Sequence, residues 1–162
     1  LTLLNPAYTP FEMSRQIHHS DACAVVTIPE KYPAVSEAIS SNKTSLRFPP
    51  IVIPTGSEPV PESTINFSEL IADGIVEFEK TGEQLTIDPA RDTFLLPYSS
   101  GTTGLPKGVE VTHKSIGPNF HQLRQPEYIF AQPAIGDHQD VIPAFLPFYH
   151  MYGFIICLHV CL

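Results

Sequence analysis

Lysine and arginine are scarce in this chain. Its 162 residues contain nine of them against 17 Asp and Glu, which gives a formal net charge of −8. Proteins that bind nucleic acids meet the phosphate backbone with clustered Lys and Arg, so this balance argues against a nucleic-acid partner. Any site for a phosphate group must therefore be a local one.

Cysteines are few, and no apolar run is long. Cys23, Cys157 and Cys161 leave one cysteine unpaired and form no C-x-x-C motif, which favours an intracellular, reducing compartment over a secreted disulfide framework. Cys157 and Cys161 lie four residues apart near His150 and His159, so a metal site is an alternative to an ordinary apolar helix there. The terminal apolar run is about nine residues, against roughly 20 for a membrane span, and no signal peptide is visible.

The composition is that of a globular protein, and the two ends suggest a piece of a larger one. The chain is 43% hydrophobic and 16% charged, with 17 prolines that predict many turns. It begins at Leu1 rather than at a methionine, and it stops within the apolar run 155–162. Because domain ends are usually solvated, we expect a fragment.

The first half of the chain predicts a βαβ unit. Thr9, Pro10 and Glu12 form an N-cap, a first-turn proline and a capping box, which predict a helix over Pro10–His19. Ala22–Ile28 then reads as a buried strand.

A second helix and strand complete this unit. Ala34–Ser41 reads as a helix and Ile51–Ile53 as a strand, so with the strand at Ala22–Ile28 we expect a parallel βαβ unit buried on both faces. The segment Asn66–Ala72 predicts a short helix capped by Asn66. The fold class is therefore α/β, with a mostly parallel sheet flanked by helices.

In the second half, a Ser/Gly/Thr-rich run lies between two predicted strands, Asp92–Ser99 and Gly108–Thr112. A helix is expected to begin at Thr112 and to break or kink at Pro118, where proline removes a hydrogen bond. Gly153–Leu162 predicts a buried helix.

The run from Ser99 to Lys107 suits an anion, because it offers hydroxyls, bare backbone and one ammonium group. It is not a Walker A loop, since Pro106 and Gly108 stand where that motif needs glycine and Ser or Thr. The alternative is an ordinary surface turn. The expected phosphate donors are Ser99, Ser100, Gly101, Thr102, Thr103, Gly104 and Lys107.

Twelve consecutive positions from Leu96 to Lys107 resemble the signature of the adenylate-forming (AMP-binding) superfamily, which includes acyl- and aryl-CoA synthetases and firefly-type luciferases. Leu3–Ser20 is similar to the family's segment before its first core strand. Leu146–Gly153, LPFYHMYG, is similar to a motif of the 4-coumarate-CoA ligase branch. The chain is thus identified as part of the N-terminal adenylation domain, with the C-terminal lid domain absent.

This resemblance implies an ATP-dependent ligase. A carboxylic acid attacks the α-phosphate of Mg²⁺-ATP to form acyl-AMP and pyrophosphate, and coenzyme A then displaces AMP. The Ser99–Lys107 run would hold the β- and γ-phosphates, His150 would orient the acyl carboxylate, and Tyr152 would line the acyl pocket. A partly buried histidine in an aromatic cluster is the alternative for His150.

The resemblance also implies what these residues lack. The family's Mg²⁺ ligand, ribose-binding aspartate and adenylation lysine fall on motifs outside them, so no metal ligand is assigned here and the chain by itself is expected to be inactive. The alternatives are a truncated, non-catalytic nucleotide-binding or interaction remnant, or a luciferase-like monooxygenase parent. Both the cytoplasm and the peroxisome remain open as compartments.

Overall fold

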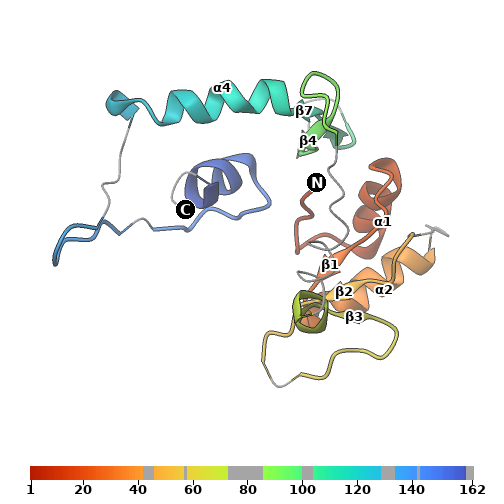
Figure 1. The fold of residues 1–162 in the computed structure, drawn as a ribbon. Helices are drawn as coiled ribbons and strands as arrows, with labels where there is room; N and C mark the ends of the chain where they lie inside the picture. Colours follow the sequence, from red (N-terminus) through yellow and green to blue (C-terminus); the bar gives the residue numbers. More distant parts are fainter. Residues whose placement is uncertain are drawn as a thin grey trace. The chain divides into compact units, whose positions relative to one another are not determined.

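The computed structural model describes residues 1–41, 46–56, 58–72, 86–99, 104–128, 134–141 and 143–159. The chain divides into two compact units, one of residues 4–86 and one of residues 1–3 with 87–162 (Figure 1). Each unit has its own hydrophobic core.

The 4–86 unit opens with α1 (Pro10–His19), whose predicted start is confirmed in detail. The Thr9 hydroxyl accepts the Glu12 N–H at 3.3 Å, and the Glu12 carboxylate accepts the Thr9 N–H at 2.8 Å. Pro10 occupies the first turn, where its missing N–H has no helical partner to lose. A reciprocal capping box therefore sets the first residue of α1.

The capping box makes α1 sensitive to acid. The backbone hydrogen bond from Thr9, followed by its hydroxyl, lowers the pKa of Glu12 below its ordinary value of 4.5. Since the folded-state pKa is the lower one, the contribution to stability is present above the ordinary pKa and is lost as the pH falls through the folded-state value. We expect Glu12→Gln to remove this acid dependence in urea titrations followed by far-UV circular dichroism. An unchanged acid dependence in that variant would contradict the assignment.

The predicted parallel pairing is confirmed. β1 (Val26–Thr27), β2 (Ile51–Val52) and β3 (Ile65–Asn66) form a three-stranded sheet in that order, and both pairs are parallel. Between β1 and β2 the chain passes through the short helix η1 (Pro29–Lys31) and α2 (Tyr32–Ser41) (Figure 1).

The burial of β1 differs from the prediction. Val25 packs with α1 and α2 in a core of Met13, Ile17, Val25, Val35 and Ala38. Thr27 is buried, but Val26 between them is 54% exposed. The expectation of a strand buried on both faces is therefore wrong for β1, because the two helices cover only one face of the sheet within this unit.

The strand β3 was not predicted, whereas the helix after it was. Asn66 pairs with Val52 and its side-chain oxygen accepts the Ser68 N–H at 3.0 Å. Helix follows at once over the described residues 67–72. Asn66 therefore ends a strand and caps the next helix.

The other unit is built on a ribbon of two antiparallel strand pairs. β4 (Thr93–Leu95) pairs with β7 (Val111–Thr112), and β5 (Tyr98–Ser99) pairs with β6 (Lys107–Gly108). The Val109 N–H donates to the Pro97 carbonyl at 2.9 Å between the two pairs. The two predicted strands are thus each interrupted once, and they run antiparallel to each other.

The ribbon leads directly into α4 (His113–Leu123), which Thr112 caps by accepting the Ser115 N–H at 3.2 Å. The prediction for Pro118 was a break or a kink, and the break does not occur: α4 continues through Pro118 to Leu123 (Figure 1). Two features explain this. Gly117 has no Cβ to clash with the proline ring, and α4 is anchored to a hydrophobic core on both sides of Pro118.

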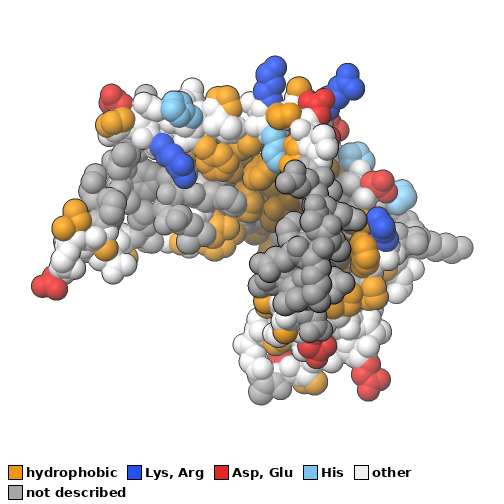
Figure 2. Space-filling model, in the orientation of Figure 1, with side chains coloured by type: hydrophobic (Ala, Val, Ile, Leu, Met, Phe, Trp, Pro, Cys, Tyr) orange, Lys and Arg blue, Asp and Glu red, His pale blue; other side chains and the backbone are white. Residues whose placement is uncertain are grey.

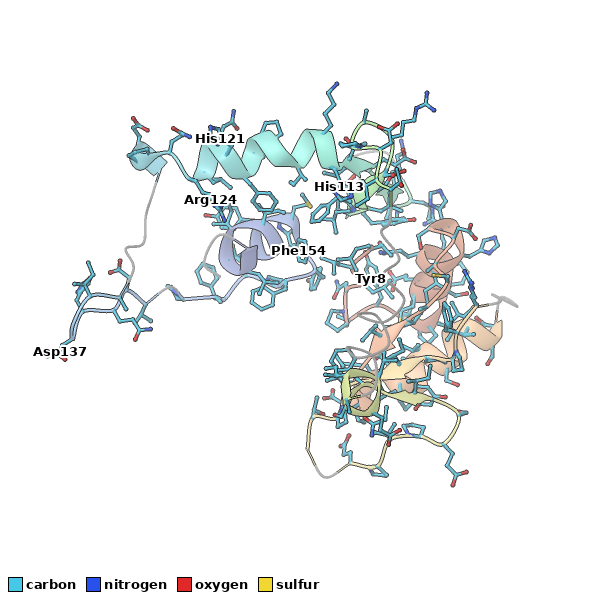
Figure 3. The ribbon with its side chains drawn as sticks, viewed as in Figure 1. Tyr8, His113, His121, Arg124, Asp137 and Phe154 are labelled. Atoms are coloured by element: carbon cyan, nitrogen blue, oxygen red, sulfur yellow. The ribbon has the colours of Figure 1, made fainter. Side chains whose placement is uncertain are left out.

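That core joins the ribbon, α4 and the last helix. A run of helix begins at Met151 and continues as the π-helix η3 (Gly153–His159), which confirms the predicted helix for the described residues. Phe154 lies on η3 beneath α4 (Figure 3). The buried members of the core are Leu95, Ile116, Phe154 and Ile155, with Phe120 and Leu123 packed against them.

The connection from α4 to η3 runs through the short helix η2 (Pro126–Tyr128) and an exposed turn closed by Ile135 and His138. Asp137 lies at the tip of that turn (Figure 3). In the ranges that the structure describes, no helix has the length and apolar character needed to cross a bilayer.

Candidate functional site

Two members of the predicted anion site, Ser99 and Lys107, lie at the base of the loop that joins β5 and β6. Ser99 ends β5 and Lys107 begins β6, and the two residues are direct partners in the antiparallel register. Direct partners project their side chains from the same face of a ribbon. The structure therefore places the Ser99 hydroxyl and the Lys107 ammonium side by side, as neighbouring donors for an anion.

Both donors are available to a ligand. Ser99 and Lys107 are exposed, and within the described part of the chain neither side chain has a hydrogen bond or an ion pair. The predicted donors Ser100, Gly101, Thr102 and Thr103 lie outside the described residues. What the structure supports directly is a loop that joins two strands, as expected, with a lysine and a serine at its base.

Gly104, the last predicted member of the loop, has a backbone conformation that favours glycine. Its φ is +141°, and an added Cβ would meet nothing within 4 Å. A substitution here is therefore strained by the backbone alone rather than by a clash. Glycine is favoured at this position by its backbone conformation, and not because neighbouring atoms leave no room for a side chain.

Gly104→Ala should therefore destabilise the hairpin by about 1–3 kcal/mol. Gly56→Ala is the matched control, since a Cβ there also faces open space but its φ lies outside the left-handed region. We expect chemical denaturation to show a loss only for Gly104→Ala. Equal losses for the two variants would rule out backbone strain at Gly104 as the cause.

Behind the loop, the hairpin is closely packed. A Cβ at Gly108 would lie 3.2 Å from the Leu96 side chain and 3.3 Å from the Tyr98 ring. Leu95, in the preceding strand, is fully buried in the core of this unit. The base of the loop is thus held by strand pairing and by packing against Leu96 and Tyr98.

The second predicted group, at His150, lies where the last helix begins. The His150 N–H donates to the Pro147 carbonyl at 3.0 Å, and the His150 carbonyl accepts the Phe154 N–H at 2.9 Å. The ring nitrogen Nδ1 accepts the Tyr152 N–H at 3.2 Å. His150 therefore acts as the N-cap of this helix, because its side chain satisfies the amide two residues later.

The surroundings of His150 differ from the alternative prediction, a partly buried histidine in an aromatic cluster. The histidine is exposed, and so is Tyr152, at 53%. Phe148 is also 45% exposed. A partly buried histidine within an aromatic cluster is therefore not what the structure shows.

The close packing at Gly153 was missed by the sequence analysis. A Cβ there would lie 2.8 Å from the Pro147 carbonyl carbon and 2.9 Å from the Leu146 oxygen, and closer still to the Pro147 oxygen. All three atoms are backbone, which cannot move aside as a side chain can. The glycine at the end of LPFYHMYG was the available signal, but a glycine alone does not identify what it approaches.

The remaining histidines and cysteines do not form a second site in the described ranges. His18, His19, His121 and His138 are exposed, and His138 contacts Asp140 at 3.2 Å. His113 is half-buried against the edge of Phe94.

The described residues also give no support to the alternative of a metal site at the last helix. Cys157 is a free thiol, and Cys161 lies outside the described residues. No group of three or more His, Cys, Asp or Glu that could hold a metal occurs among the residues described. The face seen in Figure 2 carries Lys and Arg side chains at scattered points rather than in one patch.

The hairpin tip and the His150 segment are built on one core. Leu95 precedes Ser99 by four residues and Phe154 follows His150 by four, and both are buried in the same cluster. No hydrogen bond links Ser99 or Lys107 to His150 within the described residues. The two predicted groups are therefore linked through neighbours in the same hydrophobic cluster, and not by a hydrogen bond to each other.

Sequence comparisons with known proteins agree with one another. The family model described as "AMP-binding enzyme" matches residues 1–162. 4-Coumarate–CoA ligase 3 of Arabidopsis thaliana is 35% identical over 160 residues, covering 94% of this chain and 24% of that protein. Acyl-CoA synthetase 7 of Caenorhabditis elegans is 34% identical over 153 residues, covering 90% and 26%. The chain thus spans about a quarter of the length of these curated relatives.

Solved structures agree on the fold. A red-emitting luciferase from Phrixothrix hirtus matches 97% of this chain and 36% of its own, with a TM-score of 0.71 and 26% identity. ATP-bound MatB from Rhodopseudomonas palustris matches 97% of this chain and 27% of its own, with a TM-score of 0.63 and 24% identity. The family model covers the whole chain, and the hairpin carries the family's signature from Leu96 to Lys107; this chain belongs to the AMP-binding enzyme family.

Proposed function

We propose that the gene product containing this chain is an AMP-forming acid–thiol ligase, which activates a carboxylic acid with ATP and transfers the acyl group to coenzyme A. The chain forms part of its N-terminal adenylation domain, and the C-terminal lid lies outside these residues. The observation that carries the proposal is the paired, exposed Ser99 and Lys107 at the base of a strand-to-strand loop with the family's signature.

The hairpin would act on the triphosphate. In the first step a carboxylate oxygen bonds to the α-phosphorus of ATP, and the bond to the β-phosphate oxygen breaks to release pyrophosphate. Negative charge grows on the departing phosphates, so the Lys107 ammonium and the hydroxyls from Ser99 to Thr103 stabilise the transition state more than the ground state. Ser99 and Lys107, whose backbones are paired in the ribbon, need little reorganisation when that charge develops.

His150 would act on the acid. His150 and Tyr152 are both exposed, so the histidine can orient the carboxylate for attack while Tyr152 lines the acyl pocket. In the second step the thiol sulfur of coenzyme A attacks the acyl carbon, AMP leaves, and the thiol proton passes to solvent. A remnant that binds nucleotide without catalysis, and a luciferase-like oxygenation, are the competing outcomes.

The Mg²⁺ that accompanies ATP would neutralise phosphate charge. In the part of the chain that the structure describes, no cluster of three or more metal-ligating side chains is present. The family resemblance implies that the Mg²⁺ ligand lies on a motif outside these residues, and no step in the account passes through a metal ligand here.

The test uses the complete gene product with ATP, Mg²⁺, coenzyme A and a panel of cinnamic-type, benzoic-type and fatty acids. We expect at least one acid to yield its acyl-CoA, with AMP as the nucleotide product, by mass spectrometry. An oxygen-dependent product in place of a thioester would favour the luciferase-like alternative. The absence of a thioester from every acid would refute the ligase proposal.

A further inference from the structure

The first residues of the chain lie along the strand that leads into the β5–β6 hairpin. The Leu1 nitrogen donates to the Phe94 carbonyl at 3.3 Å, and the Leu96 N–H donates to the Leu1 carbonyl at 2.7 Å. A residue that bonds to the two positions on either side of Leu95 has the pattern of a parallel pair. β4 therefore has Leu1 as well as β7 as a neighbour, and residues 1–3 belong to the same compact unit as the hairpin.

Thr2 makes the next contact, at the joint where β4 ends and β5 has not yet begun. Its hydroxyl donates to the Leu96 carbonyl at 2.8 Å, although the two residues are 94 positions apart in the sequence, and the bond is partly buried. The Pro97 carbonyl accepts the Val109 N–H at 2.9 Å, and proline has no N–H to satisfy. Every backbone polar group of this joint is therefore paired, and Leu1 and Thr2 pair both groups of Leu96.

Leu96 connects this contact to the anion donors. Its side chain covers Gly108, where an added Cβ would lie 3.2 Å from it. Gly108 follows Lys107 in β6, and Lys107 is the direct partner of Ser99. A shift of Leu96 would therefore move the point from which the β5–β6 hairpin leaves the ribbon, and the two donor side chains would move with it.

We propose that Thr2 is a positioning residue for the triphosphate site: its hydroxyl fixes the Leu96 carbonyl, and this sets the direction in which Ser99 and Lys107 project. The inference rests on the proposed function above. Donors stabilise a developing charge best when they are in place before it appears, so a looser joint would slow the release of pyrophosphate. The bond from Leu96 to Leu1 joins main-chain atoms alone, and Thr2 is therefore the member of this contact that a substitution can test.

Two substitutions isolate the hydroxyl of Thr2. Thr2→Val keeps the branched shape and removes the donor, whereas Thr2→Ser keeps the donor. In the complete gene product we expect Thr2→Val to slow acid-dependent pyrophosphate release about two- to tenfold, the effect of one hydrogen bond, and Thr2→Ser to retain most of the rate. The KM for the acid should be unchanged in both variants. Release at the wild-type rate in Thr2→Val would overturn the proposal.

A double-mutant cycle separates positioning from general destabilisation. When Lys107→Ala is already present, Thr2→Val should cost less than it does in the wild type, because one of the groups to be positioned is gone. Thr64→Val is the matched control, since the Thr64 hydroxyl also makes a partly buried bond to a backbone carbonyl, that of Pro61 at 2.6 Å, in the other compact unit. It should leave pyrophosphate release unchanged. Full additivity in the cycle, or an equal loss of rate in Thr64→Val, would refute the positioning role.

Hydrogen exchange tests the same contact without any activity, so its failure is distinct from that of the proposed ligase. The Val109 amide, which is bonded to the Pro97 carbonyl, reports opening of the joint. In the complete gene product without nucleotide, we expect this amide to exchange about two- to tenfold faster in Thr2→Val, and at the wild-type rate in Thr2→Ser and Thr64→Val. That result would support the hold of Thr2 on the joint even if no thioester were formed. Wild-type exchange in Thr2→Val would overturn the proposal even if a thioester were found.

Discussion

Lys107→Ala is expected to slow acyl-adenylate formation by about 10²–10³-fold, because one preorganised charge on the departing pyrophosphate is removed. Lys107 is exposed and lies opposite Ser99, and it forms no ion pair with a carboxylate of the described ranges. Its loss should therefore remove a ligand contact and no structural contact. The rate of pyrophosphate release in single-turnover experiments measures the effect, and binding of the acid should be largely unchanged.

Two controls make this result specific. Lys114→Ala removes another exposed lysine, at the start of α4 and away from the hairpin tip, and it should leave the rate near that of the wild type. Lys107→Arg keeps the charge but changes its shape, so it should recover part of the rate. A rate of pyrophosphate release that is unchanged in Lys107→Ala would contradict the role given to this residue.

Leu95→Ala should destabilise the unit that carries the hairpin by about 2–5 kcal/mol, the range for truncating a fully buried leucine. Leu95 is fully buried, and its cluster joins β4, α4 and η3. The cavity would lie in the cluster that joins the strand before the hairpin, through Leu95, to the last helix, through Phe154. Denaturant titration of the gene product, followed by hydrogen exchange at the amides of α4, measures the loss.

Thr93→Ala is the matched control for Leu95→Ala. It lies in the same strand two residues earlier and is exposed, so its effect should stay within about 0.5 kcal/mol. Equal effects of the two variants on exchange in α4 would contradict the view that one core supports the hairpin and the last helix.

Local chemistry made the N-terminal half of the fold predictable. The capping box of α1 involves residues three positions apart, so the sequence alone is sufficient to recognise it. The parallel pairing of β1 with β2 followed from the helix between them. By contrast, the exposure of Val26 depends on what covers the second face of the sheet, and no pattern within the strand contains that information.

Pro118 shows how packing can override a local rule. Proline inside a helix costs about 3 kcal/mol relative to alanine, which favoured a break. The buried Ile116 and the packed Phe120 and Leu123 hold α4 against the core on both sides of it. The missing Cβ of Gly117 also removes part of the usual clash. The sequence shows all of these residues, but the free energy gained by their burial depends on η3, which is distant along the chain.

The candidate site was recognisable in its residues but not in its geometry. The signature from Leu96 to Lys107 identified the donors, and the strand-to-strand loop was foreseen, but the pairing of Ser99 with Lys107 required the register. Likewise His150 was singled out by its motif. Its role as a helix cap, and the need for glycine at position 153, depend on backbone contacts that a one-dimensional pattern does not encode.

The most direct test of the central claim is the exchange of labelled pyrophosphate into ATP by the complete gene product without coenzyme A. The assay isolates the step assigned to the Ser99–Lys107 hairpin. The account predicts exchange that requires a carboxylic acid and that is lost in Lys107→Ala while Lys114→Ala retains it. Exchange that is absent with every acid, or that persists undiminished in Lys107→Ala, would contradict the claim that this hairpin holds the triphosphate of an acid-activating ligase.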